Sequence, residues 1–185
     1  MPRFSRLICL SLTSFFLVAA AAPLRAESLQ ADATVASHNR IRRAVGVKPL
    51  HWSEELAGKA RRYIGQMKEN GCRMQHNGPG ENLYWASPLQ TATEKNAFGM
   101  WKWRNAEQKI PAEKVVAAWA SEKQWYTRAT NTCEAPMGES CGHYTQIVWA
   151  ATTAVGCARA VCEDKSQVWL CLYAPAGNII GQRPY

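Results

Sequence analysis

The octapeptide Gly142-His143-Tyr144-Thr145-Gln146-Ile147-Val148-Trp149 is the most informative stretch of this 185-residue chain. In it, Tyr144, Gln146 and Val148 alternate with Thr145, Ile147 and Trp149. This period of two predicts a half-buried β-strand over residues 144–150. His143 stands at the mouth of that strand, with Cys141 two residues before it. A histidine in such a place usually bonds only to a backbone carbonyl, so the octapeptide alone favours a structural role for His143.

The start of the chain has the pattern of a secretory signal peptide, which we place over residues 1–26. Arginines form a positive start, a nearly continuous apolar run covers residues 7–22, and small residues follow. We expect cleavage after Ala26, because a cut farther upstream would leave Pro23 at the new terminus. An uncleaved N-terminal anchor is the alternative. Residues 27–185 contain no second long apolar run, so we expect no transmembrane helix there.

The charge of the chain argues against nucleic-acid binding. Loss of the leader removes Arg3, Arg6 and Arg25 and no acidic residue, so the net charge falls from +8 to +5. The remaining basic residues are mostly scattered and form no stripe between aromatic residues of the kind that nucleic acids require. A weak attraction to an anionic membrane or cell-wall surface is compatible with this charge.

The cysteines predict a disulfide framework. Seven occur, and Cys9 leaves with the leader. An even number in a secreted chain indicates three disulfides, whose pairing the spacing alone does not decide. A zinc cluster is the competing interpretation, but no Cys-x-x-Cys pair occurs. The six cysteines that remain are Cys72, Cys133, Cys141, Cys157, Cys162 and Cys171.

The first part of the mature chain predicts helices. Apolar residues recur at helical spacing over residues 31–45. Ser53 is placed to cap a second helix, which ends at Asn70-Gly71, where glycine can adopt the left-handed conformation. A third helix is predicted to begin near Pro111, since proline suits a first helical turn.

A carboxylate lies on the apolar stripe of this third helix. Glu122 stands between Trp119 and Tyr126 at a spacing that places all three side chains on one face. Glutamates are seldom buried without a partner. Either Glu122 has such a partner, or it lies at the edge of the stripe and reaches water.

The last part of the chain predicts strands. Runs over residues 144–150, 155–161 and 167–174 have alternating patterns and short polar links, which indicate an antiparallel meander. Helices that precede a strand cluster predict an α+β fold, with helices covering at least one face of the sheet. The length of residues 27–185 suits a single domain with one sizeable core.

Residues 87–110 are predicted to be irregular. A loop this long inside a compact domain is usually functional or mobile. Trp101 and Trp103 lie within it, beside Lys102 and Arg104. These tryptophans either pack onto the core or form a lid that contacts a ligand.

A second pair of ionisable residues precedes the strand region. A turn rich in glycine and proline separates His76 from Glu81. Together with Glu122 and His143, they form a reasonable donor set for a divalent cation or a general acid–base set. No His-Glu-x-x-His element occurs, so the spacing alone does not establish either chemistry.

Four motifs occur in a fixed order along the chain: His38-Asn39-x-x-Arg42, Gly80-Glu81-Asn82-Leu83, the octapeptide, and Cys171-Leu172-Tyr173-Ala174-Pro175-Ala176-Gly177-Asn178. Together they resemble the CAP superfamily, which comprises cysteine-rich secretory proteins, insect venom antigen five and plant pathogenesis-related proteins of group one. The resemblance covers residues 38–185, and the ending Gly181-Gln182-Arg183-Pro184-Tyr185 is most similar to the plant-type branch.

The resemblance implies a three-layer α-β-α sandwich with a central antiparallel sheet, stabilised by disulfides. The tetrad that lines the family's central cleft falls on His76, Glu81, Glu122 and His143. In some members the two histidines hold zinc or another divalent ion. His76 and His143 are therefore the implied metal ligands, with Glu81 and Glu122 as further candidates, and no cofactor is obligatory.

The resemblance also implies the disulfide pairs Cys72–Cys162, Cys133–Cys141 and Cys157–Cys171. Two departures from the family pattern stand out. Leu172 occupies a position where many relatives carry asparagine, which removes one polar contact. The segment 87–110 is longer than in plant-type relatives, so we expect it to influence what the protein binds.

The function that the resemblance implies is that of a secreted, non-enzymatic protein, extracellular or periplasmic, with a role in defence or host–microbe interaction. Its expected ligands are a sterol or fatty acid, a divalent cation, or both. A metal-dependent peptidase using the tetrad is one alternative, with Ser140 as a weak nucleophile candidate and no confident catalytic residue. The other is a protein-interaction effector that uses the Trp101/Trp103 loop. We expect a monomer that does not bind nucleic acid.

Overall fold

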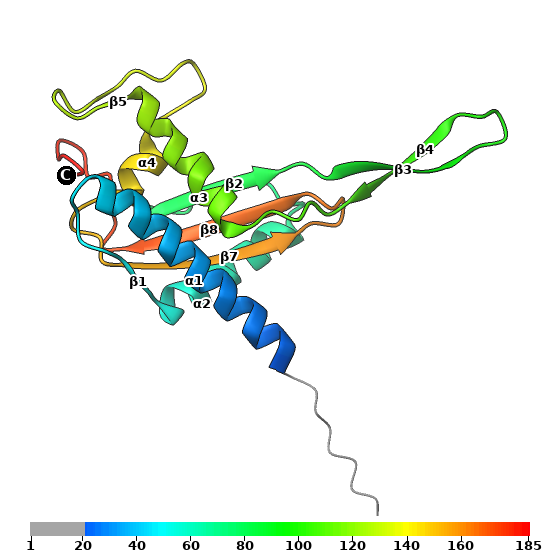
Figure 1. Cartoon of the computed structure of the whole chain (residues 1–185), viewed down its shortest axis with the longest axis horizontal. Helices are drawn as coiled ribbons and strands as arrows, with labels where there is room; N and C mark the ends of the chain where they lie inside the picture. The colour runs from blue at the N-terminus through cyan, green and yellow to red at the C-terminus, as the bar shows by residue number, and fades with distance from the viewer. Residues whose placement is uncertain (1–20) are drawn as a thin grey trace, which may run out of the picture.

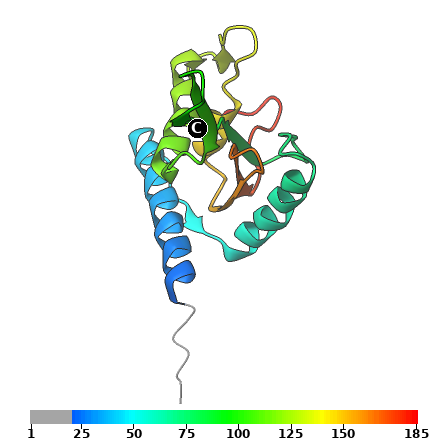
Figure 2. The same cartoon turned by 90° about the vertical axis from the view of Figure 1, so that its right-hand side faces the viewer.

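The computed structural model describes residues 21–185, with side chains from residue 30 onward. It has three layers, in which a four-stranded sheet lies between α1 and α3 on one face and α2 on the other (Figures 1 and 2). The α+β class and the layered architecture expected from the sequence are confirmed. The helices are α1 (Ala21–Ala44), α2 (Glu54–Glu69), α3 (Ala112–Ala120), the 3₁₀ helix η1 (Ser121–Trp125) and α4 (Gly142–Ile147). The strands are β1 (His51–Trp52), β2 (Glu81–Ala86), β3 (Leu89–Lys95), β4 (Trp101–Ala106), β5 (Tyr126–Thr127), β6 (Thr132–Cys133), β7 (Ala154–Val161) and β8 (Gln167–Ala174).

The central sheet has the strand order β1-β7-β8-β2. β7 and β8 form an antiparallel hairpin, and β2 pairs antiparallel with β8 through a register that sets Glu81 opposite Leu172. The two-residue strand β1 is the exception, since it runs parallel to β7. The sheet therefore matches the expected antiparallel arrangement apart from this short edge strand.

Alternate residues of β8 supply the two halves of the core. Trp169 and Tyr173 pack with residues of α3 and α4, such as Trp119 and Tyr144. Val168 and Leu170 point to the other face, against Ala60, Ile64 and Met67 of α2. This period of two is the pattern of a strand buried on both faces, and it explains why residues 167–174 are apolar almost throughout.

Helix α2 follows its sequence prediction closely. The Ser53 hydroxyl accepts the backbone N–H of Leu56 at 3.3 Å, which satisfies one of the free donors of the first turn. The helix ends at Asn70, and Gly71 has a φ of +69°. This left-handed conformation is the one that glycine adopts at low cost after a helix.

Three disulfides fasten these layers together. Cys72–Cys162 joins the segment after α2 to the end of β7, across a sequence separation of 90 residues. Cys157–Cys171 links directly opposed positions of β7 and β8. Cys133–Cys141 closes a short loop just before α4. The same three pairs are those that the family resemblance implies.

The octapeptide forms a helix, so the prediction of a strand over residues 144–150 is wrong. Tyr144, Gln146, Ile147 and Val148 are all fully buried. Gly142, His143 and Thr145 are partly exposed, whereas residues 146–149 are buried in succession, so the segment shows no apolar stripe with the helical period of 3.6. Groups from outside the helix satisfy its ends: the Glu122 carboxylate accepts two N–H groups of its first turn, and Arg42 donates to Ile147 O at the other end.

The irregular loop predicted over residues 87–110 is also wrong, because most of it forms the β3–β4 hairpin. Six cross-strand pairs define its register, with an irregularity between Ala92 and Glu94. Both faces of the hairpin are largely exposed, so no core imposes an alternation of polar and apolar residues. The turn signal Asn96-Ala97-Phe98-Gly99 was the available clue.

Most of the expected signal peptide, residues 1–20, lies outside the described part of the chain. Helix α1 begins at Ala21, so the expected cleavage point after Ala26 falls within its first turns. Over residues 21–185, no helix combines the length and the apolar character needed to cross a membrane.

Two residues of the first family motif are buried beneath the octapeptide. His38 is fully buried, with Nδ1 at 2.8 Å from Thr34 O and Nε2 at 2.7 Å from the Tyr173 hydroxyl. Burial lowers the pKa of His38 to about 4, an effect that the nearby positive charge of Arg42 reinforces. His38 is therefore neutral in the folded protein at physiological pH.

We predict that this neutral histidine makes the fold sensitive to mild acid. The pKa of His38 is about 4 when folded and about 6.5 when unfolded, so the unfolded chain takes up the proton first as the pH falls. The free energy of unfolding should drop between pH 6.5 and 4 by up to about 3 kcal/mol from this residue. Denaturant unfolding of wild type and His38→Gln measures this contribution as the difference in pH slope.

His51→Gln is the matched control, because His51 is exposed. It should keep the pH slope of the wild type, whereas His38→Gln should flatten the slope over this range. Equal slopes for the wild type and His38→Gln would contradict the assignment of the acid sensitivity to His38.

Candidate functional site

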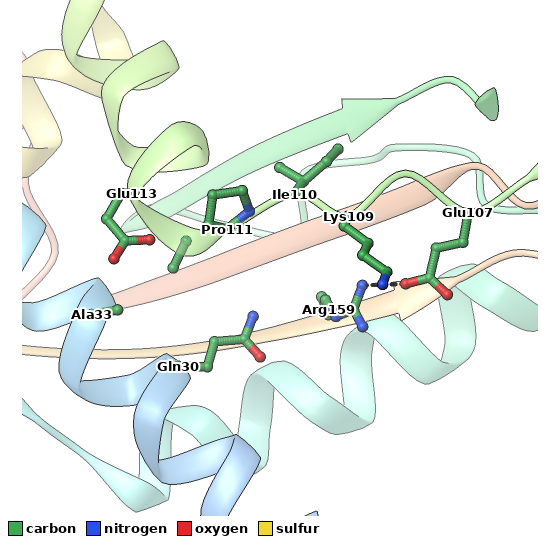
Figure 3. A pocket seen from close by; sticks show the side chains of 9 residues that line it. Gln30, Ala33, Glu107, Lys109, Ile110, Pro111, Glu113 and Arg159 are labelled. Atoms are coloured by element: carbon green, nitrogen blue, oxygen red, sulfur yellow. Dashed lines mark hydrogen bonds and ion pairs between the residues drawn. The ribbon is translucent and has the colours of Figure 1, made fainter.

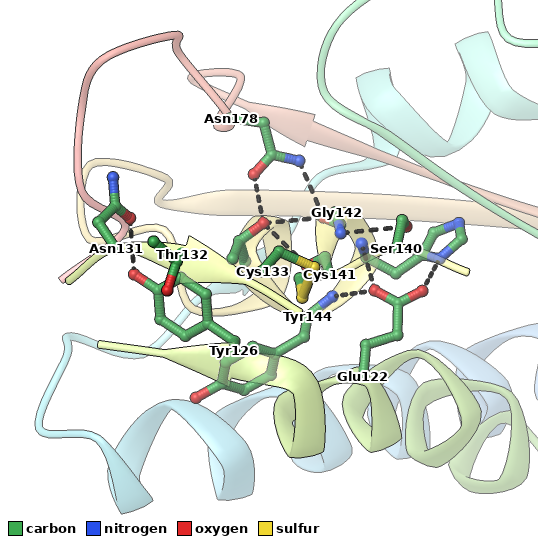
Figure 4. The surroundings of a disulfide bond; sticks show 12 residues. Glu122, Tyr126, Asn131, Thr132, Cys133, Ser140, Cys141, Gly142, Tyr144 and Asn178 are labelled. Carbon is green, nitrogen blue, oxygen red and sulfur yellow. Dashed lines mark hydrogen bonds and ion pairs between the residues drawn. A yellow bond between two sulfur atoms is a disulfide. The ribbon is translucent and has the colours of Figure 1, made fainter. Parts of the chain in front are cut away.

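Glu122 has a buried carboxylate with three hydrogen-bond donors around it. It lies in η1, directly after α3, and is only 7% exposed. Its Oε2 accepts the backbone N–H groups of His143 at 2.8 Å and Tyr144 at 3.1 Å, and its Oε1 lies 2.5 Å from His143 Nδ1 (Figure 4). Glu122 therefore has a partner and does not reach water at the edge of its stripe.

This carboxylate acts as the N-terminal cap of α4. The residue at the cap position, Cys141, makes no side-chain cap hydrogen bond, so the first N–H groups of the helix depend on a distant acceptor. A negative charge at a helix N-terminus is also favoured by the helix dipole. The unusual glutamate in an apolar stripe is thus explained by the helix that packs against it.

His143 is oriented by the same contact. Its Nδ1 faces Glu122, and its ring stacks on Trp119 with centroids 6.2 Å apart and an interplanar angle of 23°. Trp119 is itself fixed, because its Nε1 donates to Leu83 O of β2 at 2.8 Å. A carboxylate on Nδ1 favours the tautomer whose Nε2 has a free lone pair. With its side chain 28% exposed, His143 can present that nitrogen to a ligand.

His76 and Glu81 form a second pair of the same kind. His76 Nδ1 lies 3.4 Å from Glu81 Oε2, and that oxygen also accepts the backbone N–H of Asn77 at 2.9 Å. Glu81 begins β2 with a nearly buried side chain, whereas His76 lies in the preceding loop and is 58% exposed. The carboxylate is fixed, and the histidine is the more accessible member.

Asn82 joins the two pairs, and sequence reasoning did not assign it a role. It follows Glu81 in β2, is fully buried, and donates from Nδ2 to His143 O and to the Tyr173 hydroxyl, both at 3.1 Å. That hydroxyl in turn contacts His38 Nε2. Its place in the motif Gly80-Glu81-Asn82-Leu83 and among apolar neighbours was the signal in the sequence, since a buried asparagine needs hydrogen-bond partners.

The four predicted site residues thus form two His–carboxylate pairs linked through Asn82. Within residues 21–185, no group of three or more His, Cys, Asp or Glu side chains has the geometry to hold a metal ion. Glu122 is occupied by α4 and His143, and Glu81 by Asn77 and His76. In each pair it is the imidazole Nδ1 that faces the carboxylate.

The surroundings of the Cys133–Cys141 disulfide hold the first turn of α4 from the solvent side (Figure 4). Asn178 Nδ2 donates to Gly142 O at 2.8 Å, and its Oδ1 accepts the hydroxyl of Thr145 at 2.7 Å. Ser140, the weak nucleophile candidate, accepts the backbone N–H of Gly142 at 3.3 Å. Its hydroxyl is thus part of the loop that positions His143.

A separate cavity of about 430 Å³ lies where the start of α3 meets α1 and β7 (Figure 3). Its wall contains Ile110, Pro111 and Ala33, and the charged groups of Lys109, Glu107 and Arg159 gather at one end. Arg159 already pairs with Glu107 at 2.7 Å. None of the four tetrad residues lines this cavity, so a ligand here would be independent of the histidines.

Comparison of the sequence with known proteins identifies a matching family and similar proteins. The profile of the cysteine-rich secretory protein family, CAP, matches residues 35–173. The pathogenesis-related protein PRMS of Zea mays is 45% identical over 150 residues, which cover 80% of this chain and 77% of the maize protein.

Solved structures share the fold at low sequence identity. The crystal structure of Na-ASP-1 superposes with a TM-score of 0.63 and 22% identity, covering 84% of this chain and 41% of Na-ASP-1. The crystal structure of NaASP2 with Zn²⁺ gives a TM-score of 0.58 and 20% identity, covering 84% of this chain and 85% of NaASP2.

We predict that Glu122→Ala destabilises the fold by about 2 kcal/mol or more, because it leaves two buried N–H groups and His143 Nδ1 without an acceptor. Glu122→Gln keeps one oxygen acceptor and should cost less. Denaturant unfolding with the disulfides intact measures both. Glu139→Ala, which removes an exposed glutamate, is the control, and an equal effect of Glu122→Ala and Glu139→Ala would contradict the capping role.

Proposed function

The chain belongs to the CAP family of cysteine-rich secretory proteins, and we propose that it is a secreted, non-enzymatic binding protein with a role in defence or host–microbe interaction. The family membership and the similarity to a pathogenesis-related protein of maize support this role. The leader-like residues 1–26 and the three disulfides support secretion, since disulfides persist in oxidising compartments.

We propose that His76 and His143 bind a divalent cation such as Zn²⁺. The observation that carries this proposal is the contact of each Nδ1 with a carboxylate, Glu81 in one case and Glu122 in the other. This is the arrangement that fixes the tautomer and orientation of metal-binding histidines. The Zn²⁺ in the NaASP2 crystal structure gives further support. Two protein ligands predict a weaker and more exchangeable site than a closed four-ligand zinc site.

Binding is favoured over peptidase chemistry by the state of the carboxylates. A general base must be free to take a proton from a water or nucleophile. Glu122 has both oxygens engaged by His143 and the N-terminus of α4, so using it as a base would disturb the helix that carries the site. The contacts of Glu81 with His76 and Asn77 both involve Oε2, so Glu122 is the carboxylate that disfavours general-base chemistry.

We predict that His76→Ala combined with His143→Ala abolishes Zn²⁺ binding measured by calorimetry. Because the imidazoles must be neutral to bind, the affinity of the wild type should also fall as the pH is lowered. His51→Ala removes an exposed histidine outside the site and should bind Zn²⁺ like the wild type. Equal Zn²⁺ uptake by the wild type and the double variant would refute the assignment.

We further propose that the cavity between α1 and α3 takes an acyl chain or a sterol. Its volume of about 430 Å³ lies in the range of small-molecule sites. The apolar wall formed by Ile110 and Pro111 suits a hydrocarbon, and Lys109 stands where a carboxylate or polar head would lie. Glu107 and Glu113 also line the cavity, and Arg159 is paired with Glu107, so its lining suits the hydrocarbon of either an acyl chain or a sterol.

We predict that natively purified protein releases a lipid on extraction with organic solvent, identified by mass spectrometry. Ala33→Trp should fill the cavity and reduce transfer of labelled fatty acid, whereas the His76→Ala/His143→Ala variant should bind lipid as well as the wild type. An empty extract, together with no transfer of labelled fatty acid or sterol, would overturn the lipid proposal and leave the cation proposal standing.

A further inference from the structure

The β3–β4 hairpin, residues 89–106, extends away from the three-layer body (Figure 1). We call this segment the arm. Its base is fastened by Asn105 Nδ2, which donates to Asp164 O at 2.7 Å, and by Gln108 Nε2, which donates to Ser87 O at 2.7 Å. The arm therefore leaves the body at a fixed place.

The tip of the arm is an ordered turn. Asn96 N donates to Met100 O at 2.7 Å, and Gly99 N donates to Asn96 O at 2.9 Å. The Asn96 side-chain oxygen also accepts the backbone N–H groups of Phe98 and Met100. Gly99 has a φ of +78°, which glycine adopts without strain. The turn thus holds Phe98 outward at little further entropic cost when a partner covers it.

Large apolar side chains are concentrated on this tip and the adjoining strand. The exposed fractions are 87% for Phe98, 60% for Met100, 54% for Trp101 and 60% for Trp103. Trp101 and Trp103 are two residues apart in β4 and therefore project from the same face. These tryptophans do not pack onto the core, which answers one of the questions left open by the sequence. Exposed clusters of this kind mark interaction sites.

The charges on the arm are mainly positive. Lys95 lies opposite Trp101, with Nζ 5.1 Å from the ring centroid. Lys102 and Arg104 project from the other face of β4, where Glu94 pairs with Lys102 at 3.0 Å. The arm thus combines aromatic side chains with three basic residues and one acid, on a chain whose net charge is +5 without the leader-like residues 1–26.

We propose that the arm docks on a membrane surface that contains anionic phospholipids, with Phe98, Trp101 and Trp103 entering the headgroup region. Tryptophan prefers this depth of a bilayer, and lysine and arginine are attracted to anionic headgroups. The apolar tip projects from the body and does not form a groove. This shape suits insertion into the headgroup region of a bilayer. A polysaccharide could stack on Trp101 and Trp103, but it would leave Phe98 and Met100 without a role.

The test is co-sedimentation of the whole secreted protein with vesicles of phosphatidylcholine alone or mixed with phosphatidylserine. We expect binding to the mixed vesicles, a blue shift of tryptophan fluorescence, and weakening by salt. Phe98→Ser/Trp101→Ser/Trp103→Ser should reduce binding by roughly tenfold or more. Lys102→Glu/Arg104→Glu should reduce binding to the mixed vesicles while retaining the fold.

Met137→Ser/Ile180→Ser is the matched control, because it removes two fully exposed apolar side chains elsewhere. This control and His76→Ala/His143→Ala should both bind vesicles like the wild type, which separates the arm from the cation site. Unchanged vesicle binding by the triple variant would overturn the proposal. So would arm-dependent capture by insoluble β-glucan without vesicle binding, or a wild-type dimer in sedimentation that the triple variant dissociates.

Discussion

The fully buried guanidinium of Arg42 is the interaction on which the rest of the structure depends. It donates four hydrogen bonds to backbone carbonyls, those of Lys48, Ile147, Trp149 and Thr152, at 2.7 to 2.9 Å. Burial lowers the pKa of Arg42 to about 10, so the side chain keeps its charge at neutral pH. A buried charge is costly unless it is compensated by hydrogen bonds, and the bonds to Ile147, Trp149 and Thr152 end α4 and fix the chain that follows it. Arg42 and Glu122 therefore hold opposite ends of the same short helix, a cation at the C-terminus and an anion at the N-terminus, as the helix dipole favours.

The contacts that hold the two ends of α4 also fix the position of His143. A six-residue helix is too short to be stable alone, so α4 exists only because α1, η1 and the C-terminal segment supply its end contacts. His143 then takes its orientation from the same carboxylate that caps the helix. The hydrogen-bond path from His38 through Tyr173 and Asn82 to His143 O continues this support into β2 and β8. A substitution in this buried hydrogen-bond path would therefore shift α4, and with it the side chain of His143.

The sequence predicted the elements whose composition and spacing carry a clear helix or strand signal. Helix α2 has one apolar face and a serine cap, and β7 and β8 have the β-rich composition of buried strands, so all three were recognised. The strand prediction for the octapeptide failed because residues 146–149 are buried in succession and show no helical period, and β3 and β4 were missed because both of their faces are exposed. In both cases the periodic signal vanishes, and long-range contacts or backbone pairing decide the conformation. The residue types of His76, Glu81, Glu122 and His143 suggested a donor set, and the family resemblance then matched them to a cleft tetrad. Their grouping into two His–carboxylate pairs, and the place of Asn82 between them, required the distances.

The position of β2 relates the proposed sites to each other. Glu81 begins this strand next to the histidines, Ala86 ends it, and the arm starts shortly afterwards at Leu89. Six extended residues span roughly 20 Å, so the cation site and the root of the arm lie at opposite ends of one rigid strand. A protein held on a membrane by Phe98 and its neighbours would then direct His76 and His143 away from the lipid, toward solvent. Cation binding and membrane docking would then be independent, because the two proposed sites share no residue and the strand between them is held in place by β8.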